Sequence, residues 1–408
     1  MSTTPGTLTP NWLDVSRSVE TLVKPGRKLM TVLGTRPEAI KLAPVLQQAE
    51  AFSHTFQTVN VVSGQHTDLL SPFVQLFDIR IDHDLQAMLP AQTPNQLCSR
   101  VLSALDPLLA EVQPDMILVQ GDTTTALAGA LAGFHRGVRV AHVEAGLRSG
   151  NLRSPYPEEM NRRLISSLAS YHFAATARNR ETLLMEGIER DSIFVTGNPV
   201  VDSLQAILAQ ATVTDTVRQL LQRTDGTRRI ILTTHRRESF GEVLADNLRV
   251  VRCFVEAHED VTLVFPVHPN PAVVGPAKEI LQDHPRIHLI EPLSYDDFIV
   301  LLSHSWLIVS DSGGVQEEAP TLGKPLLVLR ENTERPEAIE SGVARLVGGE
   351  PRQLALMLAE AYKAGSWADE VKKAKNPFGQ GDSGQRIARI IARLLRVPAT
   401  KALTLDQR

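Results

Sequence analysis

A chain of 408 residues is too long for one ordinary hydrophobic core and fits two domains of roughly 200 residues each. Hydrophobic residues make up 43% and charged residues 22%, and the formal net charge of −4 excludes a basic surface for a nucleic-acid backbone. No run of about 18 apolar residues is present to span a membrane. The two cysteines, Cys98 and Cys253, are far apart, so we expect a reduced, cytoplasmic protein.

The first 27 residues are rich in Thr, Pro and Ser and precede the first clear strand. They lack the continuous apolar segment of a secretory signal. We interpret 1–27 as a loosely held extension, with a short helix possible around Val15–Val23.

From Lys28 onward, short β-branched runs alternate with longer helical patterns, which is typical of parallel βαβ units. The predicted strands of the first half are Leu29–Leu33, Thr58–Val62, Met116–Val119, Val138–His142, His172–Ala174 and Ile193–Thr196. Those of the second half are Arg229–Thr234, Val261–Pro266, Ile287–Ile290, Leu307–Ser310 and Leu326–Leu329. Predicted helices include Pro37–Ala51, Thr124–His135, Glu242–Ala257, Val315–Leu322 and Ser383–Leu395.

Two successive sets of strands predict an α/β protein with two Rossmann-like domains that face a central cleft. We expect the first domain at 28–197 and the second at 198–380. In open α/β sheets, ligands bind beyond the carboxyl ends of the strands. Polar residues at those turns therefore carry more weight than the same residues elsewhere.

The first such turn follows strand Leu29–Leu33 and reads Gly-Thr-Arg-Pro-Glu from Gly34. Arg36 lies at a helix start and Lys41 one turn further in, and two cations beside helix amides suit an anion. A capped helix start with solvated charges is the alternative. We favour the phosphate site because Arg36 falls at the ligand-facing turn.

The strongest local pattern is the strand Leu307–Ser310 that runs into Ser312, Gly313 and Gly314 and then into a helix. Glycines let backbone amides approach a diphosphate closely at a helix start. Glu318, one turn into the helix, is placed to accept hydrogen bonds from a ribose diol. No Lys follows the glycines as in a P-loop, which argues against ATP hydrolysis.

Three carboxylates occupy turns of the first domain, namely Asp122, Glu144 and Glu158. Carboxylates gathered in one place repel each other, which raises some pKa values and suits acid–base chemistry. Helix capping is at least as good an explanation for Asp122 or Glu158 taken alone, but three acids at the ligand end of one sheet favour function. In the second domain, His235 and His268 end two successive strands and are placed to donate to a leaving diphosphate. We see no metal-ligand spacing and no nucleophile elbow.

These segments, in this order, resemble the non-hydrolysing UDP-N-acetylglucosamine 2-epimerases over about Lys28 to Leu395. The matching segments of the first domain are Gly34–Lys41 (GTRPEAIK), Gly121–Thr125 (GDTTT), His142–Arg148 (HVEAGLR) and Ser154–Glu159 (SPYPEE). Those of the second are His235–Phe240 (HRRESF), Pro266–Pro271 (PVHPNP), Asp311–Pro320 (DSGGVQEEAP) and Glu334–Ala338 (ERPEA). Only the combination is specific.

The resemblance implies a glycosyltransferase-B-like fold in which the last helix, 381–396, crosses back to the first domain. It implies reversible conversion of UDP-GlcNAc to UDP-ManNAc by a cytoplasmic homodimer, without nicotinamide or another cofactor, for surface polysaccharide synthesis. The residues that it assigns to UDP are Arg36, His235, Ser312, Gly313, Gly314, Glu318 and Arg335, with Phe298 beside the uracil. Lys41, Asp122, Glu144 and Glu158 are assigned to the sugar.

Three other functions keep the same nucleotide site. A glycosyltransferase of this fold needs an acceptor groove, which sequence does not reveal, and a hydrolysing relative releases free ManNAc. A nucleotide-sugar sensor keeps the glycine turn but has no use for the three acids. The acids favour epimerisation, by elimination of UDP to a 2-acetamidoglucal and its readdition.

One departure from the family pattern generates a prediction. Many bacterial members carry an Arg after Gln-His in the second βα loop, near a regulatory substrate site, whereas Gln65-His66 is followed here by Thr67. We therefore predict near-hyperbolic kinetics with UDP-GlcNAc and a reverse reaction that needs no added UDP-GlcNAc. A sigmoidal rate curve, or reverse turnover that demands traces of UDP-GlcNAc, would contradict it.

Overall fold

The computed structural model describes residues 26–64, 67–89, 91–210, 213–236 and 240–396. The predicted helix at Val15–Val23 and the Gln65-His66 pair lie outside these residues. Within the described ranges, no helix combines the length and apolar character that crossing a membrane requires.

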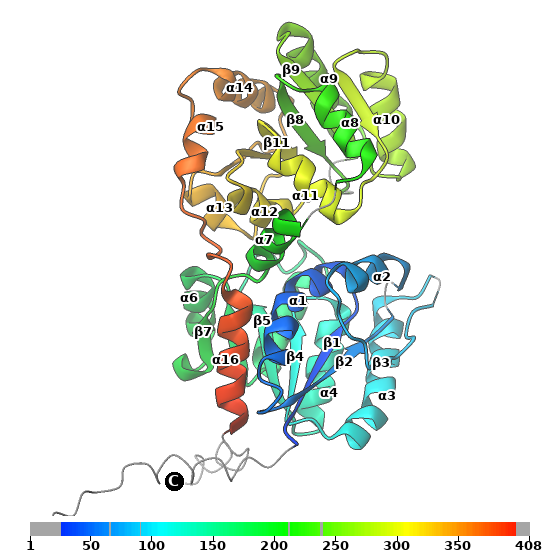
Figure 1. The fold of residues 1–408 in the computed structure, drawn as a ribbon, viewed down its shortest axis with the longest axis vertical. Coiled ribbons are helices and arrows are strands. Elements are labelled where there is room, and N and C mark those ends of the chain that lie inside the picture. The colour runs from blue at the N-terminus through cyan, green and yellow to red at the C-terminus, as the bar shows by residue number, and fades with distance from the viewer. Residues whose placement is uncertain (1–25, 65–66, 90, 211–212, 237–239, 397–408) are drawn as a thin grey trace, which may run out of the picture.

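The first sheet is parallel, with the strand order β3-β2-β1-β4-β5-β6-β7 (Figure 1). Its strands are β1 (Lys28–Leu33), β2 (Gln57–Val62), β3 (His83–Asp84), β4 (Met116–Gln120), β5 (Arg139–Ala145), β6 (Tyr171–Ala174) and β7 (Ile193–Val195). Six of the seven match the predicted ranges closely. The seventh, β3, is only two residues long and has no alternation of its own to reveal it.

The second sheet is parallel too, with the order β10-β9-β8-β11-β12-β13. Its strands are β8 (Arg228–Thr233), β9 (Val261–Pro266), β10 (Ile287–Ile290), β11 (Leu307–Ser310), β12 (Leu326–Val328) and β13 (Ala344–Leu346). Only β13 was not predicted. In each sheet, chain order reverses at the first strand, which is where a ligand site is expected.

Helices fill the crossovers of both sheets. Those of the first half are α1 (Arg36–Glu50), α2 (Thr67–Leu76), α3 (Pro94–Val112), α4 (Thr124–His135), α5 (Glu158–Leu168), α6 (Ala177–Met185) and α7 (Val200–Gln210). Those of the second half are α8 (Asp215–Arg223), α9 (Glu242–Ala257), α10 (Pro271–Leu281), α11 (Tyr295–Ser303), α12 (Val315–Leu322), α13 (Pro336–Glu340), α14 (Pro351–Tyr362), α15 (Trp367–Glu370) and α16 (Ser383–Arg396). The predicted α/β class with two Rossmann-like domains is confirmed.

The central strands are apolar on both faces because helices cover both sides of each sheet. Strand β4 is buried over its whole length, and so is β11 in the second sheet. Burial of such runs supplies most of the driving force for folding and leaves only the strand ends for polar work.

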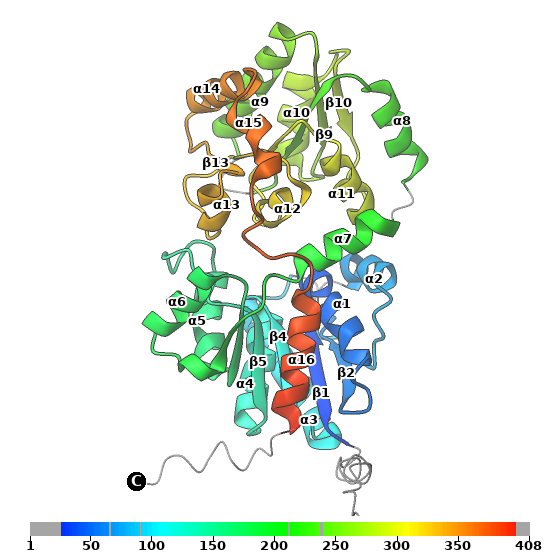
Figure 2. The ribbon, with the colours of Figure 1, turned by 60° about the vertical axis from the view of Figure 1, so that its left-hand side comes forward.

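The last helix returns to the first domain, as predicted. Figure 2 shows α16 lying along α1. On α16, Ile387 and Ile391 are fully buried, whereas Arg389 is exposed. Asp202 of α7 fixes its start, because its carboxylate accepts from the Ser383 amide at 3.2 Å and the Gly384 amide at 2.9 Å. The chain therefore passes between the domains twice, at Asn198 and at Phe378. The two passages lie side by side, because the Asn198 amide donates to the Phe378 carbonyl at 2.7 Å.

Candidate active site

The glycine turn after β11 lies between two guanidinium groups. A Cβ atom added at Gly313 would come within 2.9 Å of Nη1 of Arg335 and 3.5 Å of Nη2 of Arg236. Gly314 is the N-cap residue of α12. The amide of Gln316 donates to the Gly313 carbonyl at 3.2 Å. Amides at a helix start and two cations form an anion site.

Asp311 holds the neighbouring turn, after β8, against this site. Its buried carboxylate accepts from the Thr234 hydroxyl at 2.7 Å and from the amides of His235 and Arg236, both at 3.0 Å. Burial alone would raise the pKa of Asp311, but the hydrogen bond and charge of His235 hold it below its ordinary value. Sequence analysis included Asp311 in a motif without giving it a role.

The two predicted histidines lie together at the ends of β8 and β9. The His235 and His268 rings are stacked with their centroids 6.0 Å apart, and both side chains are exposed. Nδ1 of His235 lies 3.2 Å from the Asp311 carboxylate, which orients the ring. Partial burial and the neighbouring His235 lower the pKa of His268, which keeps its ring neutral near pH 7.

A buried chain of alternating charges crosses from one domain to the other. Lys41 of α1 is ion-paired with Glu144, which ends β5, and its Nζ lies 2.8 Å from Oε2 of Glu317 on α12. Oε1 of Glu317 in turn lies 2.6 Å from Nε of Arg335. We call Glu144, Lys41, Glu317 and Arg335 the cross-domain charge chain. All four are buried, and Glu317 was not among the predicted residues.

The two carboxyl groups of this chain have opposite pKa shifts. Burial raises the pKa of Glu144 above its usual value, and the Glu317 charge adds to this effect against the opposing influence of Lys41. Burial also acts to raise the pKa of Glu317, but Arg335 and Lys41 outweigh it and hold that pKa low. The two cations therefore hold Glu317 in its ionised form more firmly than Lys41 holds Glu144.

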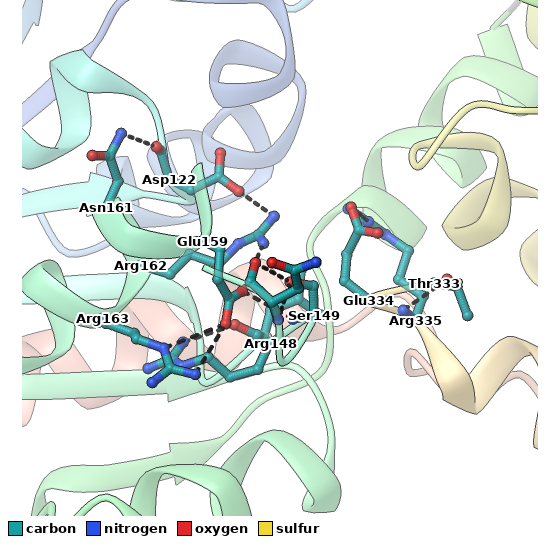
Figure 3. Close-up of polar contacts among 12 residues, drawn as sticks. Asp122, Arg148, Ser149, Glu159, Asn161, Arg162, Arg163, Thr333, Glu334 and Arg335 are labelled. Carbon is teal, nitrogen blue, oxygen red and sulfur yellow. Dashed lines mark hydrogen bonds and ion pairs between the residues drawn. The ribbon is translucent and has the colours of Figure 1, made fainter. Parts of the chain in front are cut away.

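The other two predicted acids, Asp122 and Glu158, lie close to each other. Asp122 is ion-paired with the buried Arg162 of α5, as Figure 3 shows, and its carbonyl accepts from the Asn161 side chain at 2.8 Å. One oxygen of Glu158 is buried with no hydrogen-bond partner among the described residues. Burial raises the pKa of Glu158, and the Asp122 charge reinforces that shift. Sequence analysis predicted both acids but not Arg162.

The predicted ribose acceptor, Glu318, is buried and accepts from the Tyr295 hydroxyl at 2.9 Å. Burial raises the pKa of Glu318 to about 7, against the opposing effects of Tyr295 and Arg36. Arg36 lies 5.8 Å from the ring centroid of Phe73 on α2, and that ring is 5.5 Å from the ring of Tyr295. The two domains thus also meet through aromatic rings that sequence patterns do not pair.

Glu38 ties the first turn of the site to the Asp122 loop. Its buried carboxylate accepts from the Gly34 and Thr35 amides at 3.0 and 2.7 Å and from the Thr123 hydroxyl at 2.8 Å. Burial raises the pKa of Glu38 to about 7 in spite of these donors. The turn that carries Arg36 is therefore fixed relative to Asp122.

Two further expectations concern Phe298 as a neighbour of the uracil and the absence of a metal site. Phe298 is half-buried on α11 and packs against the larger hydrophobic core, so its place beside a base stays a prediction. Among the described residues, no group of three or more His, Cys, Asp or Glu side chains has the arrangement of a metal site. Cys98 and Cys253 are free thiols.

The family profile and two similar named relatives agree on one family. A sequence profile of the family described as UDP-N-acetylglucosamine 2-epimerase matches residues 49–392. A relative with that name from Escherichia coli is 44% identical over 365 residues, which is 88% of this chain and 97% of the relative. Another with that name, from Bacillus subtilis, is 42% identical and covers 88% of this chain and 93% of its own length.

A solved structure agrees with the sequence comparison. The UDP-GlcNAc 2-epimerase from Neisseria meningitidis, bound to UDP-GlcNAc, superposes with a TM-score of 0.84 at 39% identity. The match covers 90% of this chain and 100% of that one. The similarity therefore extends through both domains.

The glycine turn generates a prediction. Gly313→Ala places a methyl group against Arg335, which Glu317 and Glu334 hold in place. Displacing charge-assisted contacts costs about 1.5–3 kcal/mol, so affinity for a nucleoside diphosphate should fall about 10- to 100-fold. Calorimetric titration with UDP measures it.

Gly275→Ala is the matched control, because a Cβ atom at Gly275 in α10 meets nothing within 4 Å. That variant should keep the wild-type affinity for UDP. Equal affinity in wild type and Gly313→Ala would remove the turn from the anion site.

Proposed function

The chain belongs to the UDP-N-acetylglucosamine 2-epimerase family, and from this premise we propose how it inverts C2 of UDP-GlcNAc to give UDP-ManNAc. The supporting observation is that both domains supply one charged interface. The second domain contributes the glycine turn flanked by Arg236 and Arg335, and the first contributes Asp122, Glu144 and Glu158.

The second domain holds most of the UDP in this proposal. Ser312, Gly313 and Gly314 bind the diphosphate together with Arg335, and Glu318 accepts from the ribose. Arg36 approaches the diphosphate from the first domain, His235 and His268 donate to it, and Phe298 lies by the uracil. The domain division from the sequence, 28–197 with 381–396 against 198–380, belongs to the same proposal.

The first step breaks the C1–O bond to the diphosphate. The C2 hydrogen is not acidic in the substrate, because no carbonyl carbon adjoins C2. As the C1–O bond lengthens, C1 gains positive charge and the C2–H bond becomes acidic. The cations Arg36 and Arg335, together with a hydrogen bond from His235, stabilise the negative charge that develops on the departing UDP.

A carboxylate then removes the C2 proton, which leaves UDP and 2-acetamidoglucal between the domains. Return of a proton to the opposite face of C2, with re-formation of the C1–O bond, gives the epimer. Two of the three carboxyl groups act as base and acid. Glu158 suits the protonating role, because burial raises its pKa and leaves one oxygen without a hydrogen-bond partner.

The related activities make different products. A glycosyltransferase or a sensor leaves UDP-GlcNAc unchanged when no acceptor is present, and a hydrolase releases UDP and free ManNAc. The homodimer, the cytoplasmic location and the surface polysaccharide pathway stay predictions from the resemblance.

One incubation tests both the function and the mechanism. Purified protein given UDP-GlcNAc alone in D2O should form UDP-ManNAc with one deuterium at C2, because the carboxyl group that returns the proton exchanges with solvent. Mass spectrometry reads the label. UDP with free ManNAc, or no product, would overturn epimerisation, and unlabelled UDP-ManNAc would overturn elimination.

Asp122→Asn should lower turnover by about 100-fold or more, as expected for loss of a general acid or base. It should also release some UDP and 2-acetamidoglucal, because the intermediate waits longer for its proton. Asp106→Asn is the matched control, since Asp106 is also ion-paired to an arginine, Arg136, but at the surface. Equal turnover of the two variants would remove Asp122 from the chemistry.

A further inference from the structure

We propose that Glu317 is a positioning residue for this reaction, which sets Lys41 and Arg335 in place only when the two domains are together. The proposal rests on the proposed function. It concerns a residue to which no contact with the diphosphate or the ribose is assigned and which acts through its two cationic partners, Lys41 and Arg335.

Glu317 and Glu318 point in different directions from the first turn of α12. Successive residues of a helix are about 100° apart around its axis, so neighbouring carboxylates serve different partners. Glu318 accepts from Tyr295 on α11, whereas Glu317 extends across the domain interface to Lys41. The same turn thus carries a predicted ligand residue and a residue that contacts the other domain.

The Glu317 carboxylate bridges two cations, Lys41 and Arg335. One carboxylate oxygen lies 2.8 Å from Nζ of Lys41, and the other lies 2.6 Å from Nε of Arg335. The side chain is 1% exposed, so water does not replace either partner. A buried carboxylate that bridges two cations fixes both of their positions.

The bridge depends on the domains being together because its partners come from different ones. Lys41 and Glu144 belong to the first domain and stay paired whatever the second domain does. The ion pair of Lys41 with Glu317 exists only when α12 lies close to the first domain. Assembly of the interface therefore completes the charge chain beside the reacting sugar.

Glu317 also affects the proton chemistry at Glu144. The charged groups that act on Glu144 are Lys41, Glu317 and Arg335, and Asn198 donates to its carboxylate at 3.3 Å. The negative charge of Glu317 raises the pKa of Glu144, so removing that charge lowers it. Lys41 and Arg335, once released from Glu317, also lower the pKa of Glu144.

Glu317→Gln keeps the shape of the side chain and removes its charge. We expect kcat to fall at least about tenfold while KM for UDP-GlcNAc changes less, because Glu334 still pairs with Arg335. The limb of the kcat–pH profile that Glu144 governs should move to lower pH by about one unit, the usual effect of one nearby charge. An effect on stability alone would leave the pH profile in place.

Glu340→Gln is the matched control. Glu340 is also ion-paired across the domain interface, to Arg178, but both side chains are exposed. Loss of an exposed pair changes stability by about 0–1 kcal/mol. This variant should keep the kcat and the pH profile of the wild type.

Two further measurements make the result decisive. In a cycle with Lys41→Met, the loss of activity in the double variant should be clearly smaller than the product of the two single losses, because Glu317 acts in part through Lys41. Glu317→Asp keeps the charge but not the reach, so it should fold as the wild type does and still lose kcat. This variant carries the test if Glu317→Gln does not fold.

The outcomes separate this proposal from the proposed function. If the wild type does not epimerise UDP-GlcNAc, the proposed function fails. If the wild type is active and both Glu317 variants match it in kcat and pH profile, only the positioning role fails. Fully additive losses with Lys41→Met would also overturn that role.

Discussion

The ion pairs of Lys41 with Glu144 and Glu317 are the constraint on which the site depends. Charges removed from water are costly, and breaking a buried pair by removing one partner typically costs about 3–5 kcal/mol. Lys41, Glu144, Glu317 and Arg335 are all buried, so each must keep a partner of opposite sign. The first domain supplies Lys41 and Glu144 and the second supplies Glu317 and Arg335. This charge balance links the carboxyl end of the first sheet, through Lys41 and Glu144, to the helix that follows the glycine turn of the second.

Local features within each domain deliver those charges to the interface. Asp311 fixes the turns after β8 and β11 to one another, and Glu38 does the same for the turns after β1 and β4. Each of these carboxylates is buried and accepts several hydrogen bonds, so neither turn of a pair can move without breaking some of them. The chemistry can therefore rely on turns that are held in fixed positions relative to one another. The two chain passages between the domains lie side by side, at Gly197 and Phe378.

The sequence predicted what depends on local pattern. Buried parallel strands are continuous apolar runs, and the strand-to-helix turns that end them carry polar residues at fixed spacing, so the long strands and the glycine turn were found. Strand β3 was missed because two residues carry no periodicity. Strand β13 was missed because Arg345 interrupts it, whereas β7 and β12, which are equally short, are continuous apolar runs. The roles of Glu317, Arg162 and Tyr295 were missed for another reason. Their partners lie in distant segments, and an acidic residue in a helix is normally a solvated one. The three predicted acids also proved unequal, since Glu144 is paired with Lys41 whereas Asp122 is paired with Arg162.

A crystal structure of the protein with UDP tests the central claim most directly, namely that both domains bind one diphosphate at the α12 turn. The account predicts the diphosphate within hydrogen-bond distance of the Gly313 or Gly314 amide and of Arg335, with Arg36 reaching it from the first domain. It also predicts that Glu317 still contacts both Lys41 and Arg335 in that complex. A diphosphate bound away from the glycine turn, or held by one domain while Lys41 and Glu317 stand apart, would contradict it.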